Sequence, residues 1–336
     1  MAYTPLHFLL TLSRELLNTF IHSAGDDGLL ARADRLLLKG PAQSNNFLLI
    51  VPITLGIILN VLIRYITGHV LMSILILETV EKQANTPEVG DKKPAPSSRQ
   101  LFRTIAVLYR KGGLRLLLSG IGSACTYWAM HSSVAKLSTI LLPGPVAYII
   151  ASVLLAETRF FWTARTILPR DQLHLVPNAR DRQRWKALVL PTLVYAVVET
   201  VMMHVPALFD SSLASSDEDV TMAGLAYIVR SDILIAGLML AAQLFLLLPS
   251  YIVLTLAQAS LLPPACETLV FTSGQQRGRR VGEIFLAVKR GPLQVQEAMQ
   301  MIGVGRLLWC LELHGKMCLS LIGVSAVVHL VVYCML

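Results

Sequence analysis

The sequence predicts an all-α membrane protein with six transmembrane helices. Of its 336 residues, 54% are hydrophobic and only 15% are charged, and the mean hydropathy is +0.60. Soluble domains carry about 25% charged residues, so this chain is too apolar for that class. Its apolar runs also reach the roughly 20 residues that a helix needs to cross a hydrocarbon core. The lipid bilayer is therefore the first partner that the sequence predicts.

Six apolar runs are long enough to be spans. They are residues 46–82, 116–141, 144–168, 186–209, 224–262 and 305–335. The first and fifth runs exceed the length of one crossing, and each contains proline or polar residues such as Pro52 and Pro249. These two spans are predicted to be tilted or kinked, or to hide an extra turn.

Residues 1–45 form a separate N-terminal segment. The stretch "PLHFLLTLSRELLNTFIH" places polar and apolar side chains on different stripes of a helix. It lacks the basic start of a secretory signal. An amphipathic helix lying in the membrane interface is predicted. The alternative is a helix that packs on the body of the protein.

The connections between spans are alternately long and short. Long ones cover about 83–115, 169–185 and 263–304, and the windows around them hold 19 Lys and Arg against 7 Asp and Glu. Basic loops stay on the cytosolic face, or in a mitochondrion on the matrix face. Amphipathic surface helices are predicted within the first and third long loops, at "LFRTIAVLYRKGG" and "GEIFLAVKRGPLQVQEAMQMIG".

The sequence gives little support for a nucleic-acid-binding protein, a metalloprotein or an enzyme. The net charge of +8 is distributed between apolar spans, without the aromatic and basic array of a nucleic-acid surface. Cys310, His314 and Cys318 share one face of a helix and could ligate a metal or haem, but packing by soft side chains is the favoured interpretation. No hydrolase, zinc-protease or nucleotide-loop motif occurs. Neither a cofactor nor a metal is predicted.

A Glu-Thr pair recurs along the chain. Three copies, at Glu78, Glu157 and Glu267, mark the ends of spans one, three and five, at the entrance to the three long loops. This placement predicts three repeats of odd helix, loop with surface helix, and even helix. The predicted repeats are residues 46–143, 144–222 and 223–336.

That organisation resembles the mitochondrial carrier family. The family ends each odd helix with Pro-x-Asp/Glu-x-x-Lys/Arg, and here the acidic position survives in "ILETVE", "LAETRF" and "ACETLV", while the proline and the basic residue are absent. The stretch "GGLRLLLSGIGSA" keeps Gly113 and Gly120 at the spacing of the family's glycine motif and is expected to allow close helix packing. The resemblance implies a threefold bundle in which Glu78, Glu157 and Glu267 gate one end.

The missing basic residues leave the expected gate incomplete. Three buried carboxylates near a common axis would repel one another and favour protonation. Lys82, Arg159 and Arg165 are the nearest cations that could compensate.

Ionisable residues deep within the spans are costly unless they are paired or line a cavity. The four deepest are the predicted substrate-binding residues: Arg64, Glu199, His204 and Lys316. The alternative is pairing between helices, or side chains that reach out to the interface.

These features together predict a membrane protein of carrier-like fold that transports a small organic, anionic solute. Because basic gate residues are missing, a non-transporting membrane scaffold or adaptor is the alternative, and a membrane-embedded enzyme is a third, less favoured one. The expected location is a mitochondrial membrane, with a peroxisomal or other endomembrane as alternatives.

Overall fold

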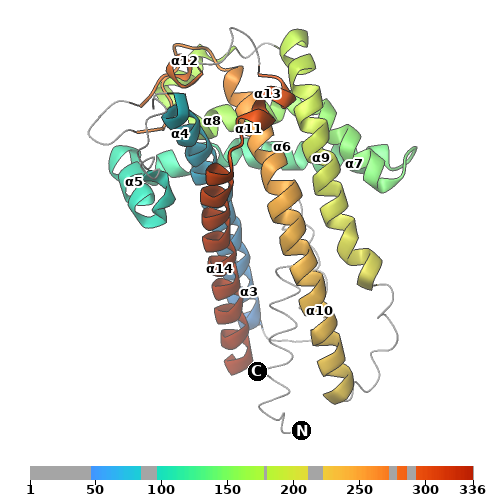
Figure 1. Ribbon diagram of the computed structural model, residues 1–336. Coiled ribbons are helices and arrows are strands. Elements are labelled where there is room, and N and C mark those ends of the chain that lie inside the picture. Colours follow the sequence, from blue (N-terminus) through green and yellow to red (C-terminus); the bar gives the residue numbers. More distant parts are fainter. Residues whose placement is uncertain are drawn as a thin grey trace. The chain divides into compact units, whose positions relative to one another are not determined.

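The computed structural model describes residues 47–84, 97–177, 180–210, 222–271, 278–285 and 293–335. Within these ranges the chain is helical, with one isolated β-bridge between Glu267 and Arg280 and no longer strand (Figure 1). The predicted all-α class is therefore confirmed. The predicted helix in residues 1–45 lies outside the described residues.

Among the described residues, four helical stretches are long and apolar enough to cross a membrane. They are Thr54–Val80, Arg182–His204, Ile233–Ser260 and Gly305–Val328. A fifth crossing is added if Gly144–Leu154 and Ala156–Ile167, which are bent by 60° at their junction, form one broken span. The membrane prediction is thus supported with four or five candidate spans, where the sequence predicted six.

The first and fifth predicted spans are each a long helix interrupted by a π-helical turn. The first consists of α3 (Phe47–Ile63), η2 (Arg64–Leu71) and α4 (Met72–Ala84). The fifth consists of α10 (Met222–Ala242), η5 (Gln243–Leu247) and α11 (Leu248–Ser260). Pro249 explains the second interruption, because its ring cannot donate a hydrogen bond and crowds the carbonyl four residues earlier.

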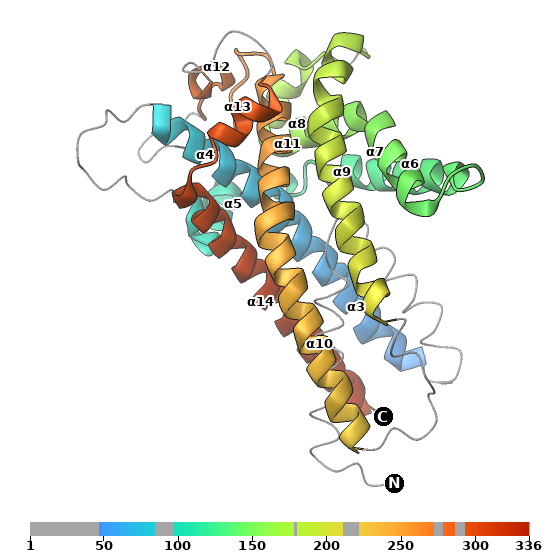
Figure 2. The same cartoon turned by 45° about the vertical axis from the view of Figure 1, so that its right-hand side comes forward.

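The second and third predicted spans differ most from expectation. Residues 116–141 divide between the end of α5 (Leu101–Leu117) and α6 (Ile121–Ser138), and α6 is not among the candidate spans. Ser, Thr, His and Lys side chains lower its hydropathy. Residues 144–168 divide into α7 (Gly144–Leu154) and α8 (Ala156–Ile167). Helices α6 and α7 pack side by side as a hairpin (Figure 2).

The remaining helices are α9 (Arg182–Asp210) and α14 (Val304–Met335), which match the fourth and sixth predicted spans, and several short elements. The short elements are η3 (Ser97–Arg99), η4 (Arg170–Leu175), α12 (Val281–Ile284) and α13 (Val295–Gln300). Helix α5 occupies the first predicted surface-helix position, and α12 and α13 lie within the other one. They are only 4 and 6 residues long.

The two glycines predicted to serve helix packing have different environments. Gly113 has a φ of 64°, which interrupts α5, and a Cβ there would meet no atom within 4 Å. A Cβ on Gly120 would lie 2.4 Å from the hydroxyl oxygen of Tyr65 and 2.8 Å from Oγ1 of Thr166. Only Gly120 therefore lies where a close approach requires glycine.

The chain divides into two compact units. The first contains residues 1–64, 199–246 and 316–336, and the second contains residues 65–198 and 247–315. The predicted repeats cut across these units. The hydrophobic core of the second unit centres on α4 and α11, with α8 leading into a smaller cluster around Phe160 and Leu188.

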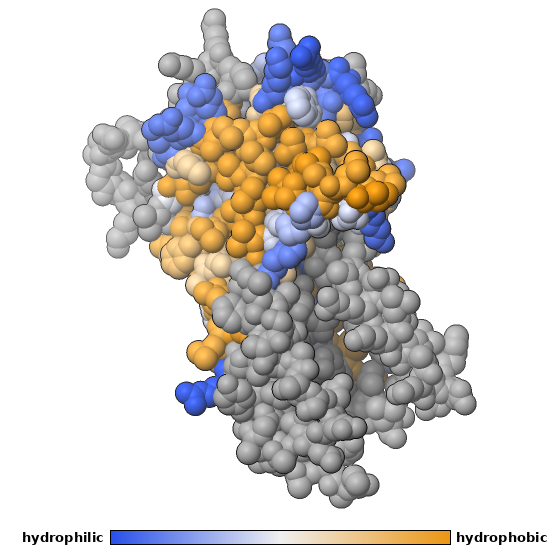
Figure 3. Space-filling view, turned by 90° about the vertical axis from the view of Figure 1, so that its right-hand side faces the viewer, coloured by the Kyte–Doolittle hydropathy of each residue, from blue (hydrophilic) through white to orange (hydrophobic). Residues whose placement is uncertain are grey.

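One face of the second unit is strongly apolar at its surface (Figure 3). Exposed apolar side chains come from the tip of the α6–α7 hairpin, from the length of α7 and from α9. They are Leu137, Ile140, Leu141, Val146, Ile150, Leu154, Leu190, Leu193 and Val197. Ile140 and Leu141, at the hairpin tip, are 78% and 87% exposed. A soluble surface rarely carries such a patch, and contact with lipid explains it.

Helices α3 and α14 of the first unit approach closely at Gly56. A Cβ at this position would lie 2.6 Å from Cγ2 of Val328. We expect Gly56→Ala to lower the free energy of unfolding by about 1–3 kcal/mol, because the added methyl group overpacks this contact. Thermal unfolding in detergent measures the effect.

Gly323→Ala is the matched control, because a Cβ there meets nothing within 4 Å. Adding Val328→Ala to Gly56→Ala should restore most of the lost stability. Equal melting temperatures for Gly56→Ala and Gly323→Ala would contradict the close contact.

Candidate functional site

Three helices of the second unit, α4, α8 and α11, pack against one another in all three pairs. Each begins at an irregularity: η2 precedes α4, the 60° bend precedes α8, and η5 precedes α11. π-helical turns occur preferentially at functional sites, because they redirect side chains. The point where these helices meet is therefore the first place to search for a site.

A small polar cavity lies among these three helices. Its lining residues are His69, Ser73, Arg159, Trp162, Thr163, Thr166, Tyr251 and Gln258. Its free volume is about 10 Å³, which suffices for about one water molecule. In this conformation the cavity has no room for a larger ligand.

Hydrogen bonds connect part of the lining. The Tyr251 hydroxyl lies 3.3 Å from Oγ of Ser73 and 3.4 Å from Nδ1 of His69. Thr163 donates its hydroxyl proton to Oε1 of Gln258 at 2.7 Å. The first group of contacts joins η2 and α4 to α11, and the second joins α11 to α8, so polar atoms link α11 to both of the other helices.

Gln258 has spare hydrogen-bonding capacity. Its residue is 2% exposed, and its buried Nε2 has no hydrogen-bond partner. Exchanging the amide oxygen and nitrogen would leave the oxygen unpaired instead, so one polar atom lacks a partner in either assignment. A buried unpaired amide atom costs about 1–3 kcal/mol, and a bound water or ligand atom would remove that cost.

Arg159 is the buried cation of the cavity and is only 2% exposed. Its guanidinium carbon lies 4.2 Å from the ring centroid of Tyr195, and the rings of Tyr127 and Trp162 are 5.6 and 5.8 Å away. The imidazole of His69 lies tilted against the ring of Trp162, with 4.6 Å between ring centroids. Stacked aromatic rings fix the orientation of a guanidinium and stabilise its charge. Such a group is suited to hold a carboxylate or phosphate.

The three repeat-marker glutamates do not occupy equivalent places in their helices. Glu78 lies within α4, Glu157 is the second residue of α8, and Glu267 follows the end of α11 by several residues. Glu78 accepts hydrogen bonds from the backbone nitrogen and the hydroxyl of Ser98, at 2.9 and 2.5 Å. Glu267 pairs through its backbone with Arg280. Beside it, burial raises the pKa of the Cys266 thiol, which therefore stays protonated.

Glu157 makes the strongest polar contact of the three. Arg184, near the start of α9, donates to Oε1 of Glu157 from Nε at 3.0 Å and from Nη2 at 2.5 Å. Both side chains are about nine-tenths buried. The compensating cation is thus Arg184 and not Arg165, whose Nη1 donates to Ser123 instead. Spacing along one helix could not reveal a partner 27 residues away.

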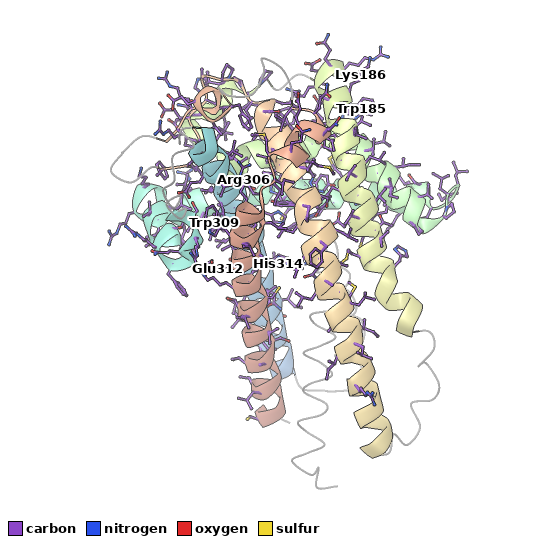
Figure 4. All side chains as sticks on the ribbon, viewed as in Figure 1. Trp185, Lys186, Arg306, Trp309, Glu312 and His314 are labelled. Atoms are coloured by element: carbon purple, nitrogen blue, oxygen red, sulfur yellow. The ribbon has the colours of Figure 1, made fainter. Side chains whose placement is uncertain are left out.

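Trp185, the next residue of α9, also contributes to this attachment, and Figure 4 labels it together with Lys186. Trp185 donates its indole N–H to the carbonyl oxygen of Val153 in α7, at 3.1 Å. Lys186, the following residue, is exposed. The start of α9 is therefore joined to both halves of the broken α7–α8 segment.

The four predicted substrate-binding residues all belong to the first unit, whereas the cavity belongs to the second. Arg64 begins η2 and is half-buried, and Lys316 of α14 is also half-buried. Glu199 of α9 is 1% exposed, and it has a polar or electrostatic contact, as Arg64 and Lys316 do. His204 is exposed and donates from Nδ1 to the Thr200 carbonyl oxygen at 2.9 Å. Their role in binding stays a prediction.

Sequence reasoning missed most of the cavity. The sequence indicates Arg159 only as a possible counter-charge to the glutamates. Within the described ranges, no group of three or more His, Cys, Asp and Glu side chains is arranged to hold a metal ion.

Comparison with known proteins gives no relative for this chain. No family model, no curated protein and no solved structure matches it.

Removal of the Arg184 guanidinium should leave the Glu157 carboxylate buried without its cation. We expect Arg184→Met to lower the free energy of unfolding by about 3–5 kcal/mol. Thermal unfolding in detergent provides the measurement. The double variant Glu157→Gln/Arg184→Met should recover most of the loss, because it leaves no buried charge. An unchanged melting temperature for Arg184→Met would refute the pairing.

Proposed function

We propose that the protein is an integral membrane transporter for a small organic anion, and that the polar cavity around Arg159 is its binding site. The observation that carries this proposal is the cavity itself. It places a buried guanidinium, an imidazole and an amide with an unpaired atom at the meeting point of three helices. Polar groups in a membrane protein are costly, and their concentration at one point favours a functional role.

The chemistry of the lining favours an anion with hydrogen-bonding groups. Arg159 supplies positive charge and planar donors. Ser73, Thr163 and Tyr251 supply hydroxyl groups that can donate or accept. Since the cavity holds about one water, the solute would enter only after the helices separate. The irregularities before α4, α8 and α11 are suited to that movement, since helices bend most readily where their hydrogen bonding is already broken.

The carrier-like organisation is part of the same proposal. Its support is the mutual packing of α4, α8 and α11, which carry or precede the three repeat markers. In this proposal α7 and α8 cross as one broken span, and α6 contributes the sixth segment with polar residues such as His131 turned inward. His131 is 1% exposed, and its Nε2 lies 2.8 Å from Oγ of Ser152 in α7. A mitochondrial membrane is the proposed location.

Uptake into proteoliposomes tests the transport proposal. Purified protein is reconstituted and screened with isotope-labelled carboxylates and phosphate esters. We expect saturable uptake that Arg159→Gln reduces at least about ten-fold, the loss expected when an ionic contact worth about 1.4 kcal/mol or more is removed. Arg159→Lys should retain part of the activity, because it keeps the charge but loses the planar donors.

Two further variants keep this test interpretable. Gln258→Met removes the unpaired amide and should raise the KM. It provides the test of the cavity if Arg159→Gln proves unstable. Arg182→Gln changes an exposed arginine near the start of α9 and is the matched control. Arg64→Ala and Lys316→Ala test the residues predicted from sequence. Uptake that is insensitive to both cavity variants would refute the cavity as the binding site.

A non-transporting scaffold is the second candidate, and the small volume of the cavity favours it. A structural polar cluster would need no access route and no solute. In that case no tested solute would be taken up, while a stable protein partner would co-purify with the reconstituted chain. Arg159→Gln would then change the melting temperature without changing any flux.

A further inference from the structure

Helix α5 carries a second surface with a distinct chemistry. We define the α5 outer face as Phe102, Arg103, Ala106, Tyr109 and Arg110, all of which are exposed. Phe102 is 83% exposed and Tyr109 is 55% exposed. Residues 102, 106 and 109 are separated by four and three positions, so they line one side of the helix. Arg103 and Arg110 each follow an aromatic residue and therefore lie along the same edge of that stripe.

The inner face of α5 holds the helix in place. Leu108 is 1% exposed, and Leu101 and Ile105 pack against the core of the second unit. Just before α5, Arg99 forms an ion pair with Glu312 of α14, which is among the residues labelled in Figure 4. The orientation of the outer face is thus fixed by contacts on the opposite side of the helix.

The charge of α5 is entirely positive. The helix contains Arg103, Arg110, Lys111 and Arg115 and no acidic residue. The Lys111 ammonium lies 3.3 Å from the ring centroid of Phe271, so this side chain is held against the protein. Arg115 follows the interruption of the helix at Gly113, whereas Arg103 and Arg110 lie beside the exposed aromatic rings. Exposed aromatic rings flanked by arginines are typical of a helix that lies in the membrane interface, with rings among the acyl chains and guanidinium groups at the phosphates.

We propose that the α5 outer face binds anionic phospholipid headgroups at the surface of the membrane that the protein spans. Charge complementarity favours this partner over zwitterionic lipid, because each basic residue near an anionic surface strengthens binding. The apolar rings favour lipid over a soluble acidic partner, because 83% exposure of a Phe side chain in water is unfavourable. This proposal is independent of transport and of the cavity.

A fluorescent probe on Phe102 tests the proposal in the full-length protein. The exposed Cys125 and Cys334 are replaced by serine, and Phe102→Cys is labelled with an environment-sensitive nitrobenzoxadiazole dye. The protein is placed in nanodiscs of phosphatidylcholine alone or of an equal mixture with phosphatidylglycerol. We expect lipid-borne spin labels to quench the dye in both, and more strongly in the anionic discs.

The arginines are tested by titration of the labelled protein in detergent with short-chain phosphatidylglycerol or phosphatidylcholine. Arg103→Gln and Arg110→Gln should each weaken binding of phosphatidylglycerol about five-fold and leave phosphatidylcholine unchanged. Arg170→Gln/Arg182→Gln removes two exposed arginines outside α5 and is the matched control. All four arginines are exposed, so these variants should fold.

Three outcomes would overturn the proposal. One is a dye that remains in water in both kinds of nanodisc, a result that would favour an acidic protein as the partner of the α5 outer face. Another is an equal response to the two lipids. The third is a preference for phosphatidylglycerol that persists without Arg103 and Arg110.

Discussion

The packing of α4, α8 and α11 depends on one constraint. Hydrocarbon offers no hydrogen-bond partner, so each polar group within a membrane must find its partner in the protein itself. Ser73, His69 and Tyr251 form one chain of contacts, and Thr163 with Gln258 forms another. Because these contacts join different helices, they fix which faces of the helices turn inward. Apolar side chains alone would allow several rotations of similar energy, since Leu packs about as well against lipid as against Leu.

The cavity combines ordered aromatic contacts with two unsatisfied polar atoms. The guanidinium of Arg159 is held over the ring of Tyr195, and the ring of His69 lies tilted against that of Trp162. Nε2 of Gln258 and Nε1 of Trp162 both lack a hydrogen-bond partner. Proteins retain few such atoms unless something else binds there, because the cost is not recovered elsewhere. The aromatic rings around Arg159 and the unpaired amide of Gln258 therefore both support the proposal that the cavity is a binding site, and they do so for different physical reasons.

The sequence predicts the long helices well because their signal is local. Runs of apolar residues identify α9, α14 and the two π-interrupted helices, and Pro249 marks the position near which η5 arises. The bend at Leu155 carries no such signal, as neither proline nor glycine occurs there. The pair of Glu157 with Arg184 and the meeting of Arg159 with Tyr127 and Tyr195 depend on contacts far apart in the chain. Periodicity and spacing describe one helix at a time, so they cannot identify such neighbours.

The attachment of Glu157 to Arg184 has a consequence for how the protein is made. A ribosome adds about 5–20 residues each second, so the 27 residues between the two partners take roughly one to five seconds to synthesise. Glu157 leaves the ribosome earlier than Arg184 by about that interval, so it reaches the membrane before its cation does. Glu157 must then remain hydrated, protonated or held by the insertion machinery until the start of α9 follows. The lasting placement of α8 is therefore completed only when the next helix arrives, and biogenesis of this segment follows the order in which its partners are translated.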